Sequence, residues 1–316
     1  MITNEKFLLC SPDKPQPMHP LDSVRLNFDP GQLILMNILL AFIMFGIALD
    51  LKLSDFKILL KKPGWILICL FAQLIALPLM TLSYIYYTNP IPSVVLGLAM
   101  VASCPGGNIS NFFTHLAKGN TALSIALTSV VTCFSFVFTP LVFAGILYFL
   151  PPNSLAKDIS LNPLQVGKTV LLIIVIPLIF GMLINHYYGQ LLQRVRKIMK
   201  TASLLIFAVF ILFALKGNWS LILNYLYQVF SLVVVHNALA LLVGFLTGWI
   251  FFNRWDNIKT ITIETGIQNS GLGLILIFNY FSDLGGMAMV AAFWGVWDMI
   301  VGLILAYFWG KWTHRQ

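Results

Sequence analysis

Long apolar stretches, separated by short groups of charged residues or by Pro and Gly, dominate the chain from residue 31 onward. Most are about as long as the ~20 residues that a helix needs to cross a bilayer. None shows the alternation over about 10 residues that is typical of a membrane β-barrel strand. The pattern predicts an all-α polytopic membrane protein with nine transmembrane helices, near 31–51, 64–87, 92–117, 121–149, 166–187, 199–216, 224–251, 259–280 and 286–310.

Two of the nine predicted spans are interrupted. Pro105-Gly106-Gly107 breaks the third, and Gly266, Gly271 and Gly273 break the eighth. One further span follows each break, so spans 1–4 correspond to spans 6–9, and the odd number of crossings between them inverts the second set. Broken helices at matching places of an inverted repeat are typical of the binding site of a secondary transporter. Between the first two spans, Ser54 to Leu60 are expected to form a short interfacial helix.

The composition agrees with a membrane protein. Apolar residues make up 59% of the chain and charged residues 9%, whereas a soluble domain has about 25% charged residues. This excludes a water-soluble fold, a disordered chain and a nucleic-acid-binding protein. Three of the four cysteines lie inside apolar stretches, so no disulfide framework is indicated.

The distribution of basic residues predicts the orientation in the membrane. With the N-terminus outside, 13 of the 19 Lys and Arg residues lie on the cytoplasmic side and 6 outside, as the positive-inside rule requires. We therefore expect residues 1–30 to form a polar extracytoplasmic tail, 31–311 a transmembrane transporter domain in the cell membrane, and 312–316 a cytoplasmic tail.

Only two of the eleven acidic residues lie well inside predicted spans, Glu264 and Asp298. A charge at this depth costs on the order of 2.5–3.5 kcal/mol on insertion scales, so such residues are usually functional. Glu264 directly precedes a broken, glycine-flanked stretch, which favours a functional role over a packing hydrogen bond. For Asp298 the two interpretations are balanced.

The two breaks predict complementary chemistry. Unwinding beside Glu264 frees backbone carbonyl groups, and hard cations prefer such oxygen ligands. At the other break, the half-helix that begins near Asn108 directs its free N–H groups and positive dipole end toward the same region, which suits an anion. Ser124 and Thr128, spaced i, i+4, and the mid-span Gln73 are expected to join the oxygen-rich cluster. His236-Asn237 are interpreted as packing residues and Cys104 as an inert thiol.

These segments resemble the bile acid:sodium symporter family over nearly everything after residue 30. The resemblance is carried by Met44-Phe45-Gly46, by Cys104 to Asn111 with Lys118-Gly119-Asn120, and by Glu264 to Gly271, about 160 residues after the first break. The chain is similar to the nine-helix animal members, which lack the first of the ten helices of bacterial relatives.

The resemblance implies a core domain near 64–149 and 224–310, with the broken helices crossing, and a panel domain near 31–51 and 166–216. It also implies two coupling Na⁺ ions and no other cofactor, with an organic anion as substrate. The first Na⁺ site would use Ser110, Asn111, Ser124, Thr128 and Glu264, the second Gln73, Glu264, Thr265, Ile267 and Gln268, and the substrate would lie near Asn108 and Asn269.

Asp298 departs from the family, because a bacterial relative has histidine at the corresponding position near the substrate cavity. We include Asp298 among the substrate-binding residues, and its carboxyl group leaves a proton-linked role open. The leading hypothesis is sodium-coupled symport of an organic anion, either bile acid-like or a small carboxylate.

Three alternatives compete with this hypothesis. The first keeps the fold but changes the cargo, as in a proton-coupled carrier or an arsenite-type exporter. Such an exporter would need a cysteine shortly after the proline of the first break, whereas Cys104 precedes Pro105. An intramembrane aspartyl protease would need paired aspartates, which Glu264 and Asp298 do not supply. A non-transporting receptor would leave the two breaks without a purpose.

Overall fold

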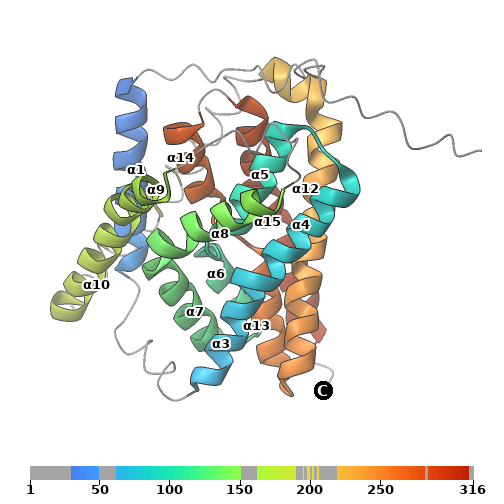
Figure 1. Cartoon of the computed structure of the whole chain (residues 1–316). Helices are drawn as coiled ribbons and strands as arrows, with labels where there is room; N and C mark the ends of the chain where they lie inside the picture. Colours follow the sequence, from blue (N-terminus) through green and yellow to red (C-terminus); the bar gives the residue numbers. More distant parts are fainter. Residues whose placement is uncertain are drawn as a thin grey trace, which may run out of the picture.

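The computed structural model describes residues 30–49, 62–150, 162–189, 195, 198–199, 201–202, 205, 219–281 and 284–312. Within these ranges all regular elements are helices, and the only strand-like pairing is one isolated antiparallel bridge (Figure 1). The all-helical prediction is therefore confirmed for the described part of the chain. The predicted span near 199–216 falls almost entirely outside these residues, and the expected interfacial helix Ser54 to Leu60 falls wholly outside them.

The helices follow one another along the whole described chain. Their bounds are α1 Pro30–Ala48, α3 Pro63–Phe71, α4 Leu77–Thr88, α5 Pro92–Ser103, α6 Ile109–Leu116, α7 Thr121–Cys133, α8 Ser135–Phe149, α9 Pro163–Val170, α10 Ile176–Tyr188, α12 Trp219–Phe251, α13 Trp255–Gly266, α14 Ser270–Tyr280 and α15 Gly285–Trp312.

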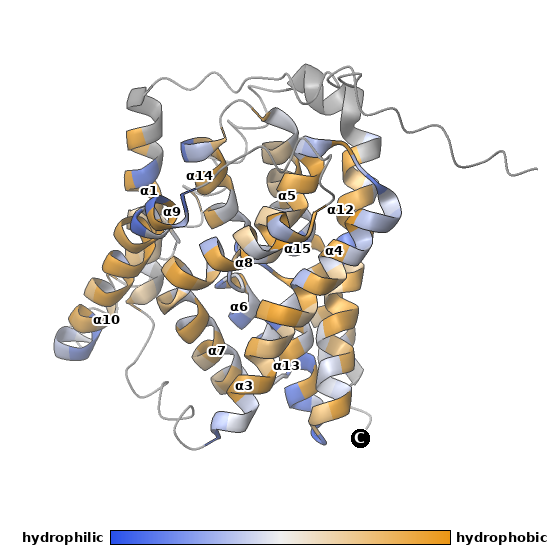
Figure 2. Ribbon diagram, in the orientation of Figure 1, coloured by the Kyte–Doolittle hydropathy of each residue, from blue (hydrophilic) through white to orange (hydrophobic). Residues whose placement is uncertain are grey.

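Several helices have the length and composition of membrane spans. In the described residues, Pro63–Thr88, Pro163–Tyr188, Val229–Phe251 and Gly285–Lys311 each qualify, and the bent pair α7–α8 adds a fifth if it is counted as one span. Residues of apolar type predominate along most of these helices (Figure 2). The chain is thus a multi-pass helical membrane protein, as its apolar pattern predicts.

Two of these long helices contain a widened turn just before a proline. A π-helical segment, Ala72–Ala76, joins α3 to α4 ahead of Pro78, and a second one, Leu171–Val175, joins α9 to α10 ahead of Pro177. Proline cannot donate a hydrogen bond to the carbonyl four residues earlier. A local π-helical turn accommodates this loss without ending the helix, and such turns are frequent at functional sites. The first of them carries Gln73.

The span predicted near 121–149 contains a bend that the sequence did not predict, because α7 and α8 meet at an angle of 76°. The α-helical dihedrals are lost at Phe134, between the two helices. Within α8, Pro140 cannot donate to the Phe136 carbonyl. Gly167 of α9 packs beside that carbonyl, where an added Cβ would lie only 2.7 Å from the oxygen. The bend therefore brings α8 into contact with α9.

The second break is shorter than the sequence predicted. Among the three glycines expected to interrupt the eighth span, only Gly266 lies at the break, where α13 ends. Gly271 and Gly273 lie inside α14, and an added Cβ on Gly273 would make only an ordinary van der Waals contact with Cys104 Sγ, at 3.5 Å.

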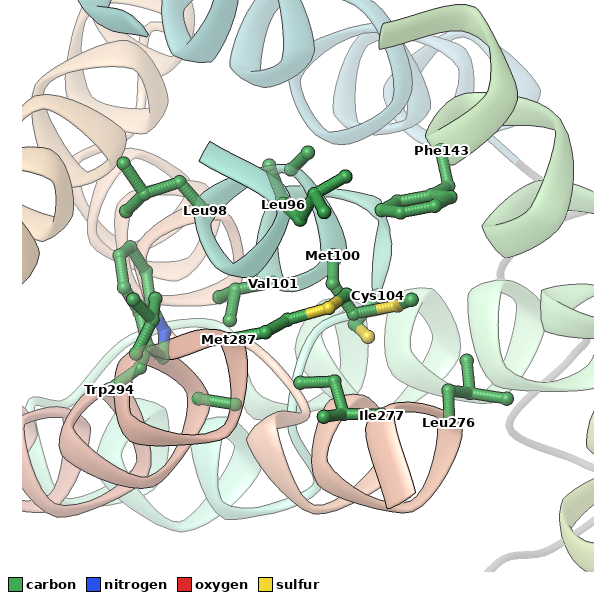
Figure 3. Close-up of a cluster of buried hydrophobic side chains, with 14 of the residues drawn as sticks. Leu96, Leu98, Met100, Val101, Cys104, Phe143, Leu276, Ile277, Met287 and Trp294 are labelled. Atoms are coloured by element: carbon green, nitrogen blue, oxygen red, sulfur yellow. The ribbon is translucent and has the colours of Figure 1, made fainter. Parts of the chain in front are cut away.

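Helix α5 forms the centre of the molecule. Its residues from Ser93 to Ser103 are all buried, as expected for a helix that is apolar on every side. It packs against α15, α8 and α4. Figure 3 shows α5 side chains meeting Phe143 of α8, Leu276 and Ile277 of α14, and Met287 and Trp294 of α15. Cys104 lies in this apolar cluster, 5% exposed, in agreement with its interpretation as an inert thiol.

Candidate functional site

The two broken helices meet at their breaks. Gly107 N donates to Ile267 O at 2.9 Å, and Asn269 N donates to Pro105 O at 2.8 Å. Between them, Gly106 and Gln268 form the isolated antiparallel bridge. The two unwound segments therefore satisfy each other's backbone groups, which is what non-helical backbone at membrane depth requires.

The glycines of the first break permit this close approach. A Cβ on Gly107 would lie 2.9 Å from Gln268 O, and one on Gly106 would lie 3.1 Å from Glu264 Oε2. Both distances are shorter than ordinary carbon–oxygen contacts, so a side chain at either position would separate the two breaks. Glycine is the residue that allows two backbones to pass this closely.

Glu264, at the C-terminal end of α13, is fully buried. Its Oε1 accepts hydrogen bonds from Ser110 Oγ at 2.5 Å and from Ser124 Oγ, and its Oε2 accepts one from Thr128 Oγ1 at 2.9 Å. Ser110 comes from α6, whereas Ser124 and Thr128 lie one turn apart on α7, the spacing that the sequence indicated. One carboxylate thus receives hydroxyl groups from two other helices.

Asn111 extends this cluster toward the surface. Its Oδ1 accepts from Ser124 Oγ at 2.7 Å and from Thr128 Oγ1 at 3.3 Å, and its side chain is only partly buried. The structure therefore brings together all five residues predicted for the first cation site, and one of them reaches the exposed side of α6.

A second group of oxygen atoms lies along the break after Glu264. Gln73 Nε2 donates to Glu264 O at 2.9 Å, and Gln268 Nε2 donates to Thr265 O at 2.8 Å. The oxygens Gln73 Oε1, Gln268 Oε1 and Thr265 Oγ1 are buried without a hydrogen-bond partner. Buried polar atoms are rarely left in this state. The residues predicted for the second cation site are thus side by side here, with Ile267 O bonded to Gly107 N.

Asn108 and Asn269 occupy equivalent places, at the N-termini of α6 and α14. Asn269 Oδ1 caps α14 by accepting from Leu272 N at 3.0 Å. Asn269 Nδ2 and Asn108 Oδ1 are buried without a partner. Two helix N-termini and two amide groups therefore flank the crossing. This is the place at which the substrate is predicted from the sequence.

Asp298 of α15 is buried against the second break. Its Oδ2 accepts from the backbone N–H of Gln268 at 3.0 Å and its Oδ1 from Asn237 Nδ2, also at 3.0 Å. Asn237 Nδ2 also donates to Gly266 O at 2.8 Å. The predicted contact between Asp298 and substrate stays a prediction.

Asn237, which was interpreted from the sequence as a packing residue, lies against the second break. A single Asn in an apolar helix carries no signal beyond its polarity, and the interpretation as a packing residue missed its bond to the break. Its neighbour His236 fits the packing interpretation, since its Nε2 is 2.8 Å from Thr81 Oγ1 and its ring contacts Tyr84 and Trp294.

Lys259 is a second feature that the sequence missed. Lys259 is one of the basic residues that the positive-inside rule assigns to the cytoplasmic side, but it is only 1% exposed. Its Nζ donates to Ala117 O at 2.9 Å, at the end of α6, and to Trp309 O of α15 at 3.2 Å. A positive charge at a helix C-terminus is stabilising. Lys259 therefore stabilises the C-terminal end of α6 and also links α13 to α15.

The family comparison agrees with these features. Residues 37–225 match the Sodium Bile acid symporter family. "Uncharacterized sodium-dependent transporter YocS" of Bacillus subtilis (strain 168) is 32% identical over 281 residues, covering 89% of this chain and 84% of that protein. "Probable sodium/metabolite cotransporter BASS1, chloroplastic" of Arabidopsis thaliana is 30% identical over 282 residues, covering 88% and 67%.

An animal relative shows the same relationship at lower identity. "Sodium-dependent organic anion transporter" of Bos taurus is 25% identical over 288 residues, which cover 84% of this chain and 74% of that protein. Taken together, the regions matched by the family model and by these relatives contain both breaks and the Glu264 cluster. The chain therefore belongs to the sodium bile acid symporter family, and it is a membrane transporter rather than an enzyme.

Proposed function

We propose that this protein is a secondary active transporter that carries an organic anion across the cell membrane together with Na⁺. The observation that carries the proposal is the Glu264 carboxylate, buried at the crossing of two broken helices and surrounded by hydroxyl groups from α6 and α7. Transporters combine unwound helices with oxygen ligands of this kind to bind Na⁺ at the bilayer midplane.

The first Na⁺ is proposed to bind among Ser110, Asn111, Ser124, Thr128 and Glu264. Within the described residues no Lys or Arg forms an ion pair with Glu264. An ionised carboxylate in this environment is costly unless a cation compensates it. In the same residues no group of three His, Cys, Asp or Glu side chains gathers to hold a metal ion. Carboxylate, amide and hydroxyl oxygens are instead the ligands of a hard cation such as Na⁺.

The second Na⁺ is proposed to bind at the break, between Gln73, Glu264, Thr265, Ile267 and Gln268. The support is the pair of glutamine side chains, each with its nitrogen on a backbone carbonyl and its oxygen buried without a partner. Rotation of each terminal amide would present both oxygens beside the same carbonyls. A cation would then satisfy oxygen atoms that have no partner in its absence.

The organic anion is proposed to bind near Asn108 and Asn269. Two helix N-termini meet there, and each contributes free N–H groups and the positive end of its dipole. The bovine relative named as a sodium-dependent organic anion transporter supports an anion of this class, bile acid-like or a small carboxylate.

The arrangement in the membrane is also a proposal. We infer nine spans in an inverted repeat, with the N-terminus outside and the C-terminus in the cytoplasm. Alternating access would arise from movement of a core domain, near 64–149 and 224–310, against a panel domain near 31–51 and 166–216.

The proposal is tested by uptake into proteoliposomes that contain the purified protein. Radiolabelled taurocholate and a radiolabelled small carboxylate serve as probes, with an inward Na⁺ gradient or with K⁺ in its place. We expect uptake of one probe to need the Na⁺ gradient and to be abolished by Glu264→Gln. Thr262→Val is the matched control, because its hydroxyl bonds only to Ile258 O of its own helix, at 2.7 Å.

Uptake that is driven equally by a proton gradient without Na⁺ would contradict sodium coupling and favour a proton-coupled carrier. An arsenite-type exporter is the other alternative. It is disfavoured by Cys104, which lies before Pro105 and is packed among apolar side chains (Figure 3).

A further inference from the structure

We propose that Asp298 is a positioning residue for the second Na⁺ site, and that it acts through the peptide unit joining Ile267 to Gln268. This inference rests on the proposed binding of Na⁺ at the break. Asp298 would not be a ligand itself. It would fix the direction of a backbone carbonyl that is one.

The contacts of Asp298 hold both sides of the break. Its Oδ2 accepts from Gln268 N, on the side toward α14. Its Oδ1 accepts from Asn237 Nδ2, and the same nitrogen donates to Gly266 O, the last residue of α13. One carboxylate on α15 and one amide on α12 therefore bracket the single residue between Gly266 and Gln268.

Because a peptide unit is planar, the bond from Gln268 N–H to Asp298 also fixes the direction of the Ile267 carbonyl. The C=O of Ile267 and the N–H of Gln268 belong to one planar peptide unit, in which they point in opposite directions. Because Asp298 holds the N–H, the Ile267 carbonyl points away from α15, toward the crossing, where it accepts from Gly107 N. Without Asp298 the peptide unit could rotate and withdraw this oxygen from the proposed site.

The burial and the hydrogen bonds of Asp298 support the same role. The carboxylate is 2% exposed, and within the described residues no Lys or Arg forms an ion pair with it. Each of its two oxygens accepts one N–H group, from Gln268 N and from Asn237 Nδ2, so the carboxyl group is held at both ends.

Residues that orient the ligands of an ion often affect affinity nearly as much as the ligands do. The test measures how Na⁺ raises the unfolding temperature of the full-length purified protein, with choline as the replacement cation and no organic substrate present. We expect Asp298→Asn to raise the half-saturating Na⁺ concentration about tenfold and to make the dependence less steep, since only one of two ions is affected. The amide keeps the size of the carboxyl but must turn a donor toward Gln268 N–H or Asn237 Nδ2.

Asn237→Ala is the second variant, in case Asp298→Asn does not fold. It removes the bonds from Asn237 Nδ2 to Asp298 Oδ1 and to Gly266 O but leaves the bond from Gln268 N intact. We therefore expect a smaller increase, about threefold, within the range of a net hydrogen-bond contribution. Thr262→Val, again the control, should leave the half-saturating concentration unchanged. A purely structural role for Asp298 would lower the unfolding temperature in choline without changing the Na⁺ dependence.

Unchanged Na⁺ half-saturation in Asp298→Asn, or in Asn237→Ala where that variant carries the test, would overturn the inference. Failure of the proposed function is a separate result. It would appear as a wild-type protein that Na⁺ does not stabilise, or as Glu264→Gln responding to Na⁺ like the wild type.

Discussion

Helices α6 and α14 both begin at the crossing, each immediately after a break, but their surroundings are opposite. Every residue of α14 from Ser270 to Phe278 is buried. In α6, by contrast, Phe112 is 48% and Leu116 40% exposed, and His115 is exposed beside them. The exposed side of α6 also carries Asn111. Polar residues at bilayer depth face a water-filled cavity or the protein interior rather than lipid, so we propose that the Asn111 side of α6 borders the route to the site.

The far end of α14 is closed by contacts with other helices. Asn37 of α1 and Asn279 exchange two side-chain hydrogen bonds, at 3.1 and 2.9 Å. Tyr280 Oη donates to Gln165 O at 2.9 Å and also bonds to Thr169 Oγ1 of α9. On the exposed side of α6, the side-chain bonds of Asn111 go instead to Ser124 and Thr128 of α7, within the site itself. We therefore propose that the protein is closed at the end of α14 and open along α6, as one of the two states of an alternating-access cycle would be.

The largest effect on Na⁺-driven uptake and on the unfolding temperature should come from disrupting the crossing at which α6 and α14 both begin. Gly107→Ala would place a Cβ 2.9 Å from Gln268 O, and backbone atoms there cannot move aside cheaply. Overpacking costs about 1–3 kcal/mol, so we expect loss of Na⁺-driven uptake and a clear fall in the unfolding temperature. Gly145→Ala on α8 is the control, because nothing lies within 4 Å of its added Cβ. Equal behaviour of the two variants would show that the close approach is unimportant.

A moderate effect on the accessibility of α14 is expected from removing the hydrogen bonds that close its far end. Asn279→Ala removes both bonds of the amide pair, each contributing about 1 kcal/mol, and should populate the state in which α14 becomes accessible. A cysteine introduced at Leu276, fully buried in α14, in a background without the native cysteines, reports the change.

We expect thiol labelling at position 276 to accelerate severalfold in Asn279→Ala. Ser83→Ala should leave the rate unchanged, because the Ser83 hydroxyl is exposed and bonds only to Leu79 O of its own helix. Identical rates for Asn279→Ala and the wild type would mean that the amide pair does not close this end.

The smallest effect should come from the charged pair at the start of α13, where Arg254 is the N-cap and Asp256 lies in the first turn. Arg254 and Asp256 form an ion pair at 2.7 Å, but the arginine side chain is 72% exposed. The hydrogen bond and charge of Asp256 raise the pKa of Arg254, which is ionised at neutral pH in any case. Exposed pairs contribute about 0–1 kcal/mol, so Arg254→Ala should barely change the unfolding temperature. A shift as large as that of Gly107→Ala would contradict this ranking.

The sequence predicts the helices well because their signals are local. Apolar stretches between Pro, Gly and charged residues predict Pro63–Thr88 and Pro163–Tyr188 to within a few residues. The bend between α7 and α8 escapes such reasoning. It depends on the contact of α9 with the carbonyl that Pro140 leaves free, and this is a tertiary interaction.

The site likewise combines features that local sequence patterns predict with features that depend on tertiary contacts. The spacing of Ser124 and Thr128 predicts that they share a face, and both do bond to Glu264. Glu264 and Gln73 were predicted from their polarity inside apolar spans, and the family resemblance supplied the remaining members of the two cation sites. Asn237 and Lys259 act through partners that are far away in the sequence, so neither composition nor periodicity could identify them. Asp298 was identified by its charge, but its bond to Gln268 N needs the folded chain.

Direct binding of radioactive ²²Na⁺ to the purified protein tests the central claim, that the oxygen cluster around Glu264 at the crossing holds Na⁺. The measurement compares the wild type with Glu264→Gln, which keeps the size of the side chain and removes its charge. Our account predicts saturable binding that non-radioactive Na⁺ displaces and K⁺ does not, and its loss in Glu264→Gln. Saturable binding of equal affinity in both proteins would contradict it.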